Sequence, residues 1–377
     1  MYNFKYNLII LGDDMKVIAF YLPQFHRFKE NDEWWGEGFT EWTNTKKATP
    51  QYKKHIQPTI PLNNNYYDLS DVETMKWQVE LAKKYGIFGF CFYHYWFGND
   101  HILMQKPIEN FLEHKEIDFP YCISWANETW SRRWNGSDKD ILIEQTYGDA
   151  KSWEKHFYYL LPYFKDSRYI KYNNKPLFIL YKPEIFPDYK EMFEKWNELA
   201  KINGLEGISF AVQGAVWNNI EFVDDSSVDL RIMYEPGFTG CQSRKKKGVN
   251  IIFWSKILKL KALFNKNNIN FQSYDAYCKN IIHRKVFSDK LVPGMFVSWD
   301  NTPRKGKNST IFLGSTPKKF GKYFRRMINK TVNEYKKDMI FINAWNEWAE
   351  GCYLEPDVVN KFDYLEEIRK SLDKNDC

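Results

Sequence analysis

The sequence predicts an α/β protein built as a single (β/α)8 barrel of the TIM type with long strand-to-helix loops. The chain has 377 residues, which is enough for one large barrel. Apolar runs rich in β-branched and aromatic residues alternate with amphipathic stretches, a pattern typical of a parallel β/α architecture. Eight such runs can be counted, the number that a closed barrel requires. They cover residues 17–22, 87–93, 120–125, 176–181, 207–213, 228–234, 292–299 and 339–345.

Six amphipathic stretches are predicted to be helices between these strands. The first follows Ser70, which forms a capping box with Glu73, and it ends at Gly86. The connection 214–227 is too short for a comfortable crossover helix, so an open sheet is the alternative to a barrel. Residues 24–69 have little periodicity, and we expect them to form a loop that shapes the substrate site. The other five predicted helices cover 105–115, 150–164, 189–203, 320–336 and 359–372.

The composition favours a globular protein that binds sugars. Hydrophobic residues make up 44% of the chain, which supports a sizeable core, and the net charge of +6 gives no indication of nucleic-acid binding. Aromatic residues reach 18%, and many of them stand beside polar residues. Aromatic rings with polar neighbours suit sugars, whose C–H faces stack on rings while their hydroxyls take hydrogen bonds. We therefore expect an oligosaccharide or polysaccharide partner.

The sequence predicts a cytoplasmic protein. Its six cysteines include no C-x-x-C pair, which fits a reducing compartment. No apolar run approaches the ~20 residues that span a bilayer, and residues 8–11 are too short for a signal peptide. Met15 opens the first strand so directly that we expect residues 1–14 to be a short extension of one catalytic domain, 15–377. The basic amphipathic segment 244–264 is interpreted as a barrel helix, with peripheral contact to the inner membrane surface, where a lipid-linked glycan would lie, as the alternative.

A stretch near the C-terminus, residues 341–351, carries the predicted catalytic residues. A buried strand runs directly into Glu347 and Glu350, which are surrounded by Trp345, Trp348 and Tyr353. In a barrel, residues just past the C-terminal end of a strand line the active site. Paired carboxylates are the usual equipment for cleaving glycosidic bonds. The alternative is that both are solvated loop acids, but their aromatic and amide neighbours favour a site.

Polar and aromatic residues also follow almost every other predicted strand, as expected for a ring around a cleft. Further candidates come from the loop 24–69. The predicted substrate-binding residues are Tyr21, Gln24, His26, Trp42, Tyr93, His94, Tyr95, Trp96, Trp125, Asn127, Glu128, Gln213, Tyr234, Trp299, Asp300, Asn346 and Trp348.

The sequence predicts no metal and no cofactor. Its seven histidines show no paired ligand spacing, and neither a G-x-G-x-x-G nor a Walker loop is present. One D-x-D pattern, Asp138-Lys-Asp140, follows polar residues instead of an apolar strand, and we interpret it as a solvated turn. A sugar-nucleotide transferase of the D-x-D type therefore gains little support.

Several long motifs resemble the WbsX family of bacterial surface-polysaccharide gene sets. They are residues 17–26, 30–36, 38–42, 89–96, 125–128, 299–304 and 343–351. This family, often called a glycosyltransferase, is similar to glycoside hydrolase family 99, whose members are (β/α)8-barrel, retaining, endo-acting α-mannosidases and mannanases. The resemblance implies that Glu347 acts as a base on the sugar 2-hydroxyl and that Glu350 is the general acid, then the base that activates the acceptor. The chain departs from family 99 at Ala349, where that family has His, and this puts hydrolytic competence in doubt.

We therefore expect an enzyme that makes or breaks glycosidic bonds in an O-antigen or capsule type of polysaccharide. The sequence leaves open whether water or a second sugar accepts the glycosyl group. The alternatives are a glycan-binding or scaffold protein with a degenerate site, and a nucleotide-sugar-dependent glycosyltransferase. Nucleic-acid binding through the basic segment would leave the aromatic residues unexplained.

Overall fold

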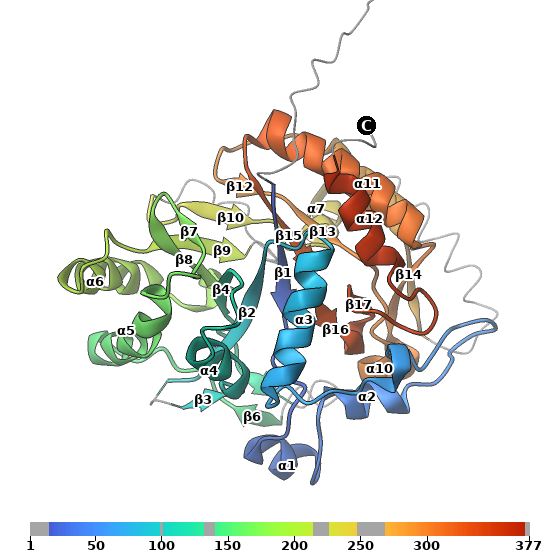
Figure 1. The fold of residues 1–377 in the computed structure, drawn as a ribbon, viewed down its shortest axis with the longest axis horizontal. Helices are drawn as coiled ribbons and strands as arrows, with labels where there is room; N and C mark the ends of the chain where they lie inside the picture. Colours follow the sequence, from blue (N-terminus) through green and yellow to red (C-terminus); the bar gives the residue numbers. More distant parts are fainter. Residues whose placement is uncertain (1–14, 99–100, 132–139, 214–225, 247–267, 374–377) are drawn as a thin grey trace, which may run out of the picture.

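The computed structural model describes residues 15–98, 101–131, 140–213, 226–246 and 268–373. Eight parallel strands form the barrel, and helices cover its outside (Figure 1). The predicted (β/α)8 architecture and the number of strands are confirmed. Along the chain the strands are β1 (Lys16–Tyr21), β2 (Gly89–Trp96), β4 (Tyr121–Trp125), β8 (Lys175–Leu180), β9 (Ser209–Gln213), β10 (Leu230–Ile232), the split strand β12 (Leu291–Val292) and β13 (Gly294–Phe296), and β15 (Met339–Asn343).

The seventh strand closes the barrel although it is split at Pro293. Its first half, β12, pairs with β10, and its second half, β13, pairs with β15. Proline has no backbone N–H to give to a neighbouring strand, but its carbonyl remains free and accepts from Phe341 N at 3.1 Å. β15 in turn pairs with β1, with Phe341 opposite Ile18. The open-sheet alternative is therefore excluded.

The six predicted outer helices are present, most of them with shifted ends, whereas α9 (Tyr274–His283) and most of α7 (Gly237–Lys246) lie outside every predicted helix. α5 (Ala150–Phe164) has the predicted bounds. The N-cap of α3 (Val72–Lys84) is Asp71, whose carboxylate accepts from Glu73 N, so the predicted capping box of Ser70 and Glu73 is wrong. Ser70 instead donates to Asp68. The remaining outer helices are α4 (Lys106–Glu113), α6 (Tyr189–Ile202), α11 (Pro317–Lys330), which continues as a π-helical turn over Thr331–Tyr335, and α12 (Asp363–Leu372).

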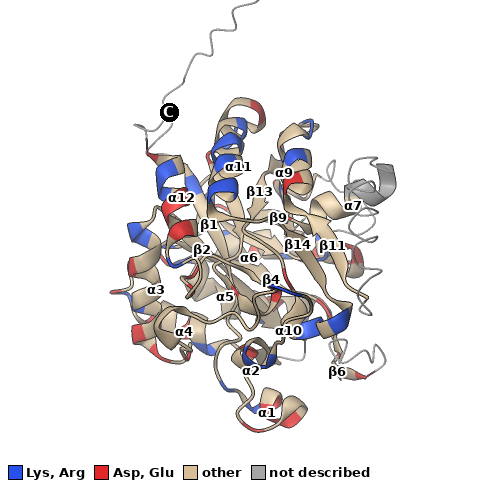
Figure 2. Cartoon of the chain, turned by 90° about the vertical axis from the view of Figure 1, so that its right-hand side faces the viewer, with Lys and Arg blue, Asp and Glu red and all other residues tan. Residues whose placement is uncertain are grey.

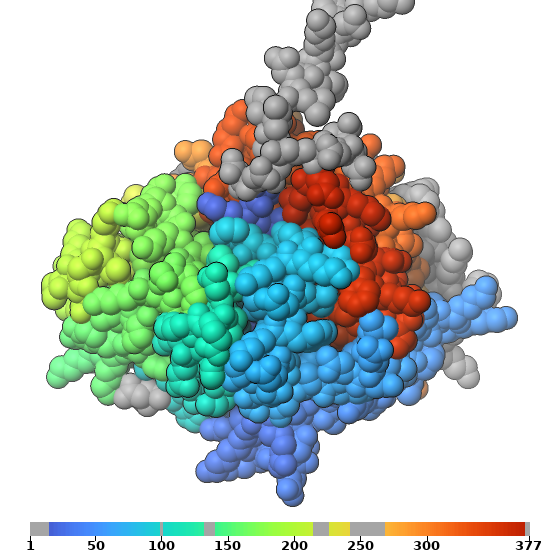
Figure 3. All heavy atoms as spheres, in the orientation of Figure 1, coloured from blue at the N-terminus to red at the C-terminus, as the bar shows by residue number. Residues whose placement is uncertain are grey.

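The loop predicted over residues 24–69 contains helices and packs against the C-terminal segment. α1 (Lys29–Trp35) and α2 (Glu41–Lys47) cover one end of the barrel, and a 3-10 turn lies at Leu62–Asn64. Leu62 N donates to Pro356 O at 2.9 Å, and the blue N-terminal part of the chain adjoins the red C-terminal part on the surface (Figure 3). Short elements complete the described chain: α10 (Thr302–Lys305), 3-10 turns at Pro183–Ile185, Gly306–Asn308 and Trp348–Glu350, and strands β3 (Ile102–Leu103), β5 (Trp130–Ser131), β6 (Ile141–Ile143), β7 (Lys171–Tyr172), β11 (Asn270–Ser273), β14 (Thr310–Leu313), β16 (Asn346–Glu347) and β17 (Cys352–Tyr353).

Some predictions fall outside the described residues. These concern the extension 1–14, nearly all of the connection 214–227, Asp138 of the D-x-D pattern, and most of the basic segment 244–264. Of the residues that are described, none belongs to a helix long and apolar enough to cross a membrane. Basic side chains are conspicuous on α9, α11 and α12, at the end of the barrel away from α1 and α2 (Figure 2).

Candidate active site

The two predicted catalytic glutamates lie on a short antiparallel hairpin that follows β15. The chain forms β16 (Asn346–Glu347), turns through Trp348–Glu350 and returns as β17 (Cys352–Tyr353). Gly351 makes the reversal with φ of 59°. Asn346 joins this hairpin to the end of β1, because its side chain accepts from Leu22 N at 2.8 Å and donates to Leu22 O at 3.0 Å.

Arg304 joins these glutamates to a third carboxylate from the N-terminal loop. Its Nη2 lies 3.0 Å from Glu347 Oε1 and 3.3 Å from Glu41 Oε2, while Nη1 lies 2.9 Å from Glu350 Oε1. The side chains of Arg304, Glu347 and Glu41 are only 10%, 8% and 2% exposed, whereas that of Glu350 is 21% exposed. Three acids thus share one buried cation, and Glu350 is the most accessible of them.

Burial raises the pKa of both predicted catalytic glutamates. For Glu347 the pKa lies well above its ordinary value of 4.5, because desolvation outweighs the opposing charge of Arg304, and Glu350 and Glu41 raise it further. The pKa of Glu350 is also raised by burial, against the charge and hydrogen bond of Arg304. Two neighbouring acids with raised pKa values titrate as a pair, a common state of carboxylates that exchange protons with a substrate.

Asp300 fixes the start of the short helix α10, which carries Arg304. Its carboxylate accepts from His55 Nε2 and Gln57 Nε2, both at 2.7 Å, and from Thr302 N at 3.0 Å. Because His55 Nδ1 accepts from Gln51 N, the ring proton must sit on Nε2 and point at Asp300. Burial alone would raise the pKa of Asp300, but these hydrogen bonds lower it below 3.8. Asp300 therefore acts on the site through the position of Arg304.

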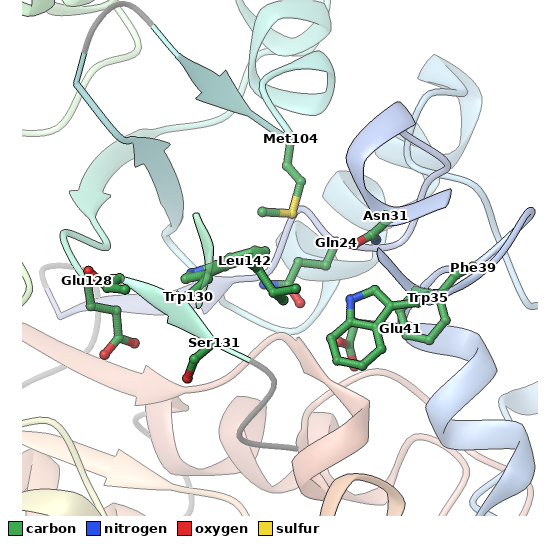
Figure 4. A pocket seen from close by; sticks show the side chains of 11 residues that line it. Gln24, Asn31, Trp35, Phe39, Glu41, Met104, Glu128, Trp130, Ser131 and Leu142 are labelled. Carbon is green, nitrogen blue, oxygen red and sulfur yellow. The ribbon is translucent and has the colours of Figure 1, made fainter. Parts of the chain in front are cut away.

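A cavity of about 110 Å³ lies beside this cluster (Figure 4). Trp35 from α1 and Trp130 from β5 line it from different sides, and Glu41 lines it while also contacting Arg304. Glu128, from the loop after β4, forms an ion pair with Lys182. Gln24 donates to the hydroxyl of Tyr95 at 3.0 Å. The cavity is lined by Gln24, Asn31, Trp35, Phe39, Glu41, Met104, Glu128, Thr129, Trp130, Ser131 and Leu142.

Several predicted site residues point into the barrel toward the glutamates. Tyr93 stacks on Phe20 at 5.5 Å between ring centres and accepts from Gln213 Nε2 at 3.1 Å. Tyr234 packs edge-on against the same Phe20. The negative charge of Glu347 contributes to the raised pKa of Tyr95, after the larger effect of burial. Tyr93, Tyr95, Gln213 and Tyr234 therefore lie inside the barrel, where the charge of Glu347 acts on Tyr95 and that of Glu350 acts on Tyr234.

Four other predicted residues lie on the outer face of the strands. Tyr21 donates to Gln78 of α3 at 2.6 Å. His94 contacts His156 of α5 through the two Nε2 atoms at 2.9 Å, and Trp96 stacks on the same imidazole at 4.4 Å. Trp125 meets His156 edge-on. These side chains, Tyr21, His94, Trp96 and Trp125, pack between the barrel and its helices, and the structure does not bring them to the glutamates.

The remaining predicted residues hold the loops together. Trp42 donates to Tyr67 O at 2.8 Å, and Asn127 exchanges hydrogen bonds with the backbone of Lys182. His26 is buried, which lowers its pKa. Trp348 stacks on Tyr353 with ring centres 3.8 Å apart. Trp299 and Asp300 line a second cavity of about 280 Å³, which shares no lining residue with the cavity of Trp35 and Trp130.

The predicted site leaves out Arg304 and nine of the eleven residues that line the cavity, among them Glu41, Trp35 and Trp130. It also leaves out Lys182, the ion-pair partner of Glu128. The signal for Arg304 and Glu41 was available, since both stand inside the motifs 299–304 and 38–42. Trp35 stands inside the motif 30–36, and Trp130 follows the motif 125–128 by two residues. Lys182 follows β8 at the expected strand end. Nothing in the spacing revealed that Glu41, about 300 residues upstream of the glutamates, reaches the same guanidinium.

The described residues contain no group of three or more His, Cys, Asp or Glu side chains arranged to hold a metal ion. The three acids of the cluster are instead gathered around Arg304.

With this geometry in view, comparisons with known proteins identify the family. The sequence matches the family described as Glycosyltransferase WbsX over residues 17–368. The chain belongs to the WbsX family. Two relatives from Xanthomonas campestris pv. campestris strains, both described as uncharacterized protein WxcX, are 33% identical over 365 residues. The match covers 94% of this chain and 49% of each relative, so this WbsX chain spans about half the length of those relatives.

Solved structures share the fold at low sequence identity. A GH99 endo-α-mannosidase from Bacteroides thetaiotaomicron superposes with a TM-score of 0.58 at 14% identity, covering 96% of both chains. A structure described as a glycoside hydrolase-like protein gives a TM-score of 0.59 at 13% identity, covering 96% of this chain and 95% of the other. The resemblance of the WbsX chain to the GH99 barrel is therefore confirmed for the fold, and the family supports a carbohydrate-active role.

Proposed function

We propose that this WbsX protein is an enzyme that makes or breaks glycosidic bonds in a bacterial surface polysaccharide, using Glu347 and Glu350 in a retaining mechanism. The observation that carries the proposal is the arrangement of two buried acids with raised pKa values around Arg304, beside a cavity lined by two tryptophans. An acid that must give a proton at neutral pH needs a raised pKa, and burial provides it. Tryptophan faces suit the C–H faces of sugars.

In the proposed first step, ionised Glu347 takes the proton of the sugar 2-hydroxyl, and that oxygen attacks the anomeric carbon. The bond to the leaving oxygen breaks as Glu350 donates its proton to it, which leaves a 1,2-anhydro sugar. In the second step Glu350 removes a proton from the acceptor, the acceptor oxygen attacks the anomeric carbon, and Glu347 returns its proton to the 2-oxygen. Two inversions give net retention. The greater exposure of Glu350 suits the group that meets both leaving group and acceptor.

The acceptor decides between hydrolysis and transfer. A site that admits water hydrolyses, and the same site occupied by a second sugar transfers the glycosyl group. Ala349 is buried at the position where family 99 has histidine, so no imidazole stands between the two glutamates in sequence. We place the substrate among oligosaccharides or polysaccharides of the O-antigen or capsule type, with a lipid-linked precursor at the cytoplasmic membrane surface as one form of it.

The proposal is tested by mass spectrometry of the source organism's surface oligosaccharides after incubation with the purified protein, with and without nucleotide sugars. Glu350→Gln serves as the matched control, because it keeps the shape of the side chain and cannot donate a carboxylic proton. We expect shortened or re-joined chains without nucleotide sugar, and at least a ~100-fold lower rate in the variant. Lengthened chains that require nucleotide sugar would instead support a true transferase. Sugar binding unchanged by Glu350→Gln, with no turnover in either arm, would support a glycan-binding protein.

A further inference from the structure

Arg304 is the only cation in direct ionic contact with the acid cluster among the described residues. If Glu41, Glu347 and Glu350 were all ionised, one guanidinium would face three negative charges. A buried site does not hold such an excess without taking up protons, since desolvation disfavours each charge. How many protons the cluster holds at neutral pH therefore depends on Arg304 and on Glu41.

The contacts of Arg304 with its three partners are unequal. Arg304 Nη1 approaches Glu350 at 2.9 Å, and a hydrogen bond from Arg304 helps to lower the pKa of Glu350. Nη2 lies between Glu347 and Glu41; a hydrogen bond links Arg304 to Glu41, whereas within the described part of the chain Glu347 Oε1 accepts no hydrogen bond of good geometry. Glu347 is thus attracted by charge without being fixed by a hydrogen bond. Its oxygen remains able to accept a hydrogen bond from another group.

We propose that Arg304 is a positioning residue that sets the division of one proton between Glu347 and Glu350, and that Glu41 offsets part of its charge. The importance of this division for catalysis rests on the proposed function. In that mechanism one glutamate must be ionised to act as a base while the other is protonated to act as an acid, so the pair holds a single proton. With Arg304 alone, both glutamates would be drawn toward the ionised form. Glu41 competes for the same Nη2 and keeps the pair from losing its last proton. Neither residue transfers a proton itself.

Other ionisable groups also face Glu347 and Glu350. Lys305 follows Arg304 on α10 and lowers the pKa of Glu350 slightly. Glu128 is neutralised by Lys182. The phenols of Tyr95, Tyr181 and Tyr234 lie close enough for the glutamate charges to raise their pKa values, and burial keeps all three neutral.

The segment that carries Arg304 is also held by backbone hydrogen bonds, apart from the ion pairs of its side chain. Asp300 fixes the first turn of α10 through Thr302, and Asp300 N donates to Glu350 O at 2.7 Å. The same short segment therefore sets the distance between the guanidinium and the turn that carries Glu350. Substitutions at Arg304 change the charge without removing this backbone link.

The test is a carboxyl ¹³C NMR titration of the full chain labelled in glutamate, with Glu347→Gln and Glu350→Gln used to assign the two signals. In Arg304→Gln we expect the apparent pKa values of the pair to rise by about 1 to 3, the usual effect of an opposite charge at this distance. Arg304→Lys should restore part of the shift. Glu41→Gln should move both values down, and the double variant should lie between the single variants.

The pH–rate profile gives the second readout. Both limbs should move to higher pH in Arg304→Gln and to lower pH in Glu41→Gln, whereas a purely structural role would lower the rate equally at all pH values. NMR shifts as expected without any turnover would support the charge division and overturn the proposed function. Circular dichroism and NMR show whether each variant is folded. Unchanged pKa values of Glu347 and Glu350 in a folded Arg304→Gln or Glu41→Gln protein would overturn the inference. If Arg304→Gln does not fold, the expected fall of both pKa values in Glu41→Gln tests the inference by itself.

Discussion

Two buried carboxylate clusters, one around Glu347 and one around Glu355, are built in different ways. Glu355 accepts hydrogen bonds from three neutral donors: Tyr67 at 2.8 Å, Gln78 at 2.7 Å and Trp348 Nε1 at 2.7 Å. Glu347 instead faces Arg304 and two further acids, and within the described chain its Oε1 accepts no hydrogen bond. A satisfied network stabilises and orders its surroundings, whereas an unsatisfied one is costly unless a ligand completes it. The contrast assigns Glu355 a structural role and supports the proposed catalytic role of Glu347.

The sharpest test of this contrast is matched truncation. At pH 5, Glu355→Ala should lower the free energy of unfolding by about 4 kcal/mol, because three buried donors lose their acceptor and a cavity remains. Glu347→Ala should cost less than about 1 kcal/mol, since Arg304 keeps Glu41 and Glu350 as partners. Urea unfolding measures both values. Activity should follow the opposite order, with Glu347→Ala inactive and any folded Glu355→Ala active; equal destabilisation of the two variants would contradict the contrast.

The pH dependence of stability gives the next largest effect. Burial raises the pKa of Glu355 from 4.5 to about 7, against the hydrogen bonds from Trp348, Gln78 and Tyr67. A folded-state pKa above the unfolded value means that this contribution is fully present below pH 4.5 and is lost as pH rises through 7. The loss amounts to about 3 kcal/mol.

Glu355→Gln should remove this loss, because the amide stays neutral at every pH and Gln78 can turn its own amide to match. The free energy of unfolding is measured for the wild type and for Glu355→Gln from pH 4.5 to 8. Glu347 and Glu350 titrate in both proteins, so the difference between the two curves reports the titration of Glu355. A difference that does not change with pH would show that Glu355 is ionised throughout this range.

His94 and Tyr95, neighbours on β2, extend the contrast to two residues that were both predicted to bind substrate. His94 faces α5 and pairs with His156, while Tyr95 faces the barrel interior and accepts from Gln24. His94→Phe should lower the unfolding free energy by about 2 kcal/mol by leaving His156 without its partner, and it should leave kcat and KM unchanged. Tyr95→Phe should change KM with little effect on stability. A raised KM in His94→Phe would return His94 to the substrate site.

The sequence predicted the barrel better than it predicted the site. Strand count and order follow from apolar runs, whose burial on both faces makes them conspicuous. That same double burial hides which face a polar residue takes, because Tyr93 and His94 both stand in one continuous aromatic run. Successive side chains of a strand point to opposite faces, so only a residue known to face inward can fix the others. Because the prediction included every residue near a strand end, it contained residues from both faces of β2.

The contribution of the N-terminal loop was unpredictable for another reason. Glu41 lies on α2, which covers the barrel end through contacts made by residues far apart in the chain, such as Trp42 against Trp348 with ring centres 5.4 Å apart. Spacing within a motif carries no information on such an approach. The motif 38–42 marked the residue but could not indicate that it meets Arg304.

The turn that joins the two clusters provides the smallest predicted effect. Gly351 has φ of 59°, and a Cβ there would lie 3.0 Å from the backbone of Asp300. Gly351→Ala should therefore cost about 1 kcal/mol and push the turn of Glu350 away from Asp300. Because Glu355 lies beyond β17 and keeps its three donors, the pH dependence of stability should stay as in the wild type, while activity falls. Urea unfolding at pH 5 and 8, with the rate measured on the same samples, separates these outcomes. Loss of the pH dependence in Gly351→Ala would mean that the two clusters depend on one another through the turn.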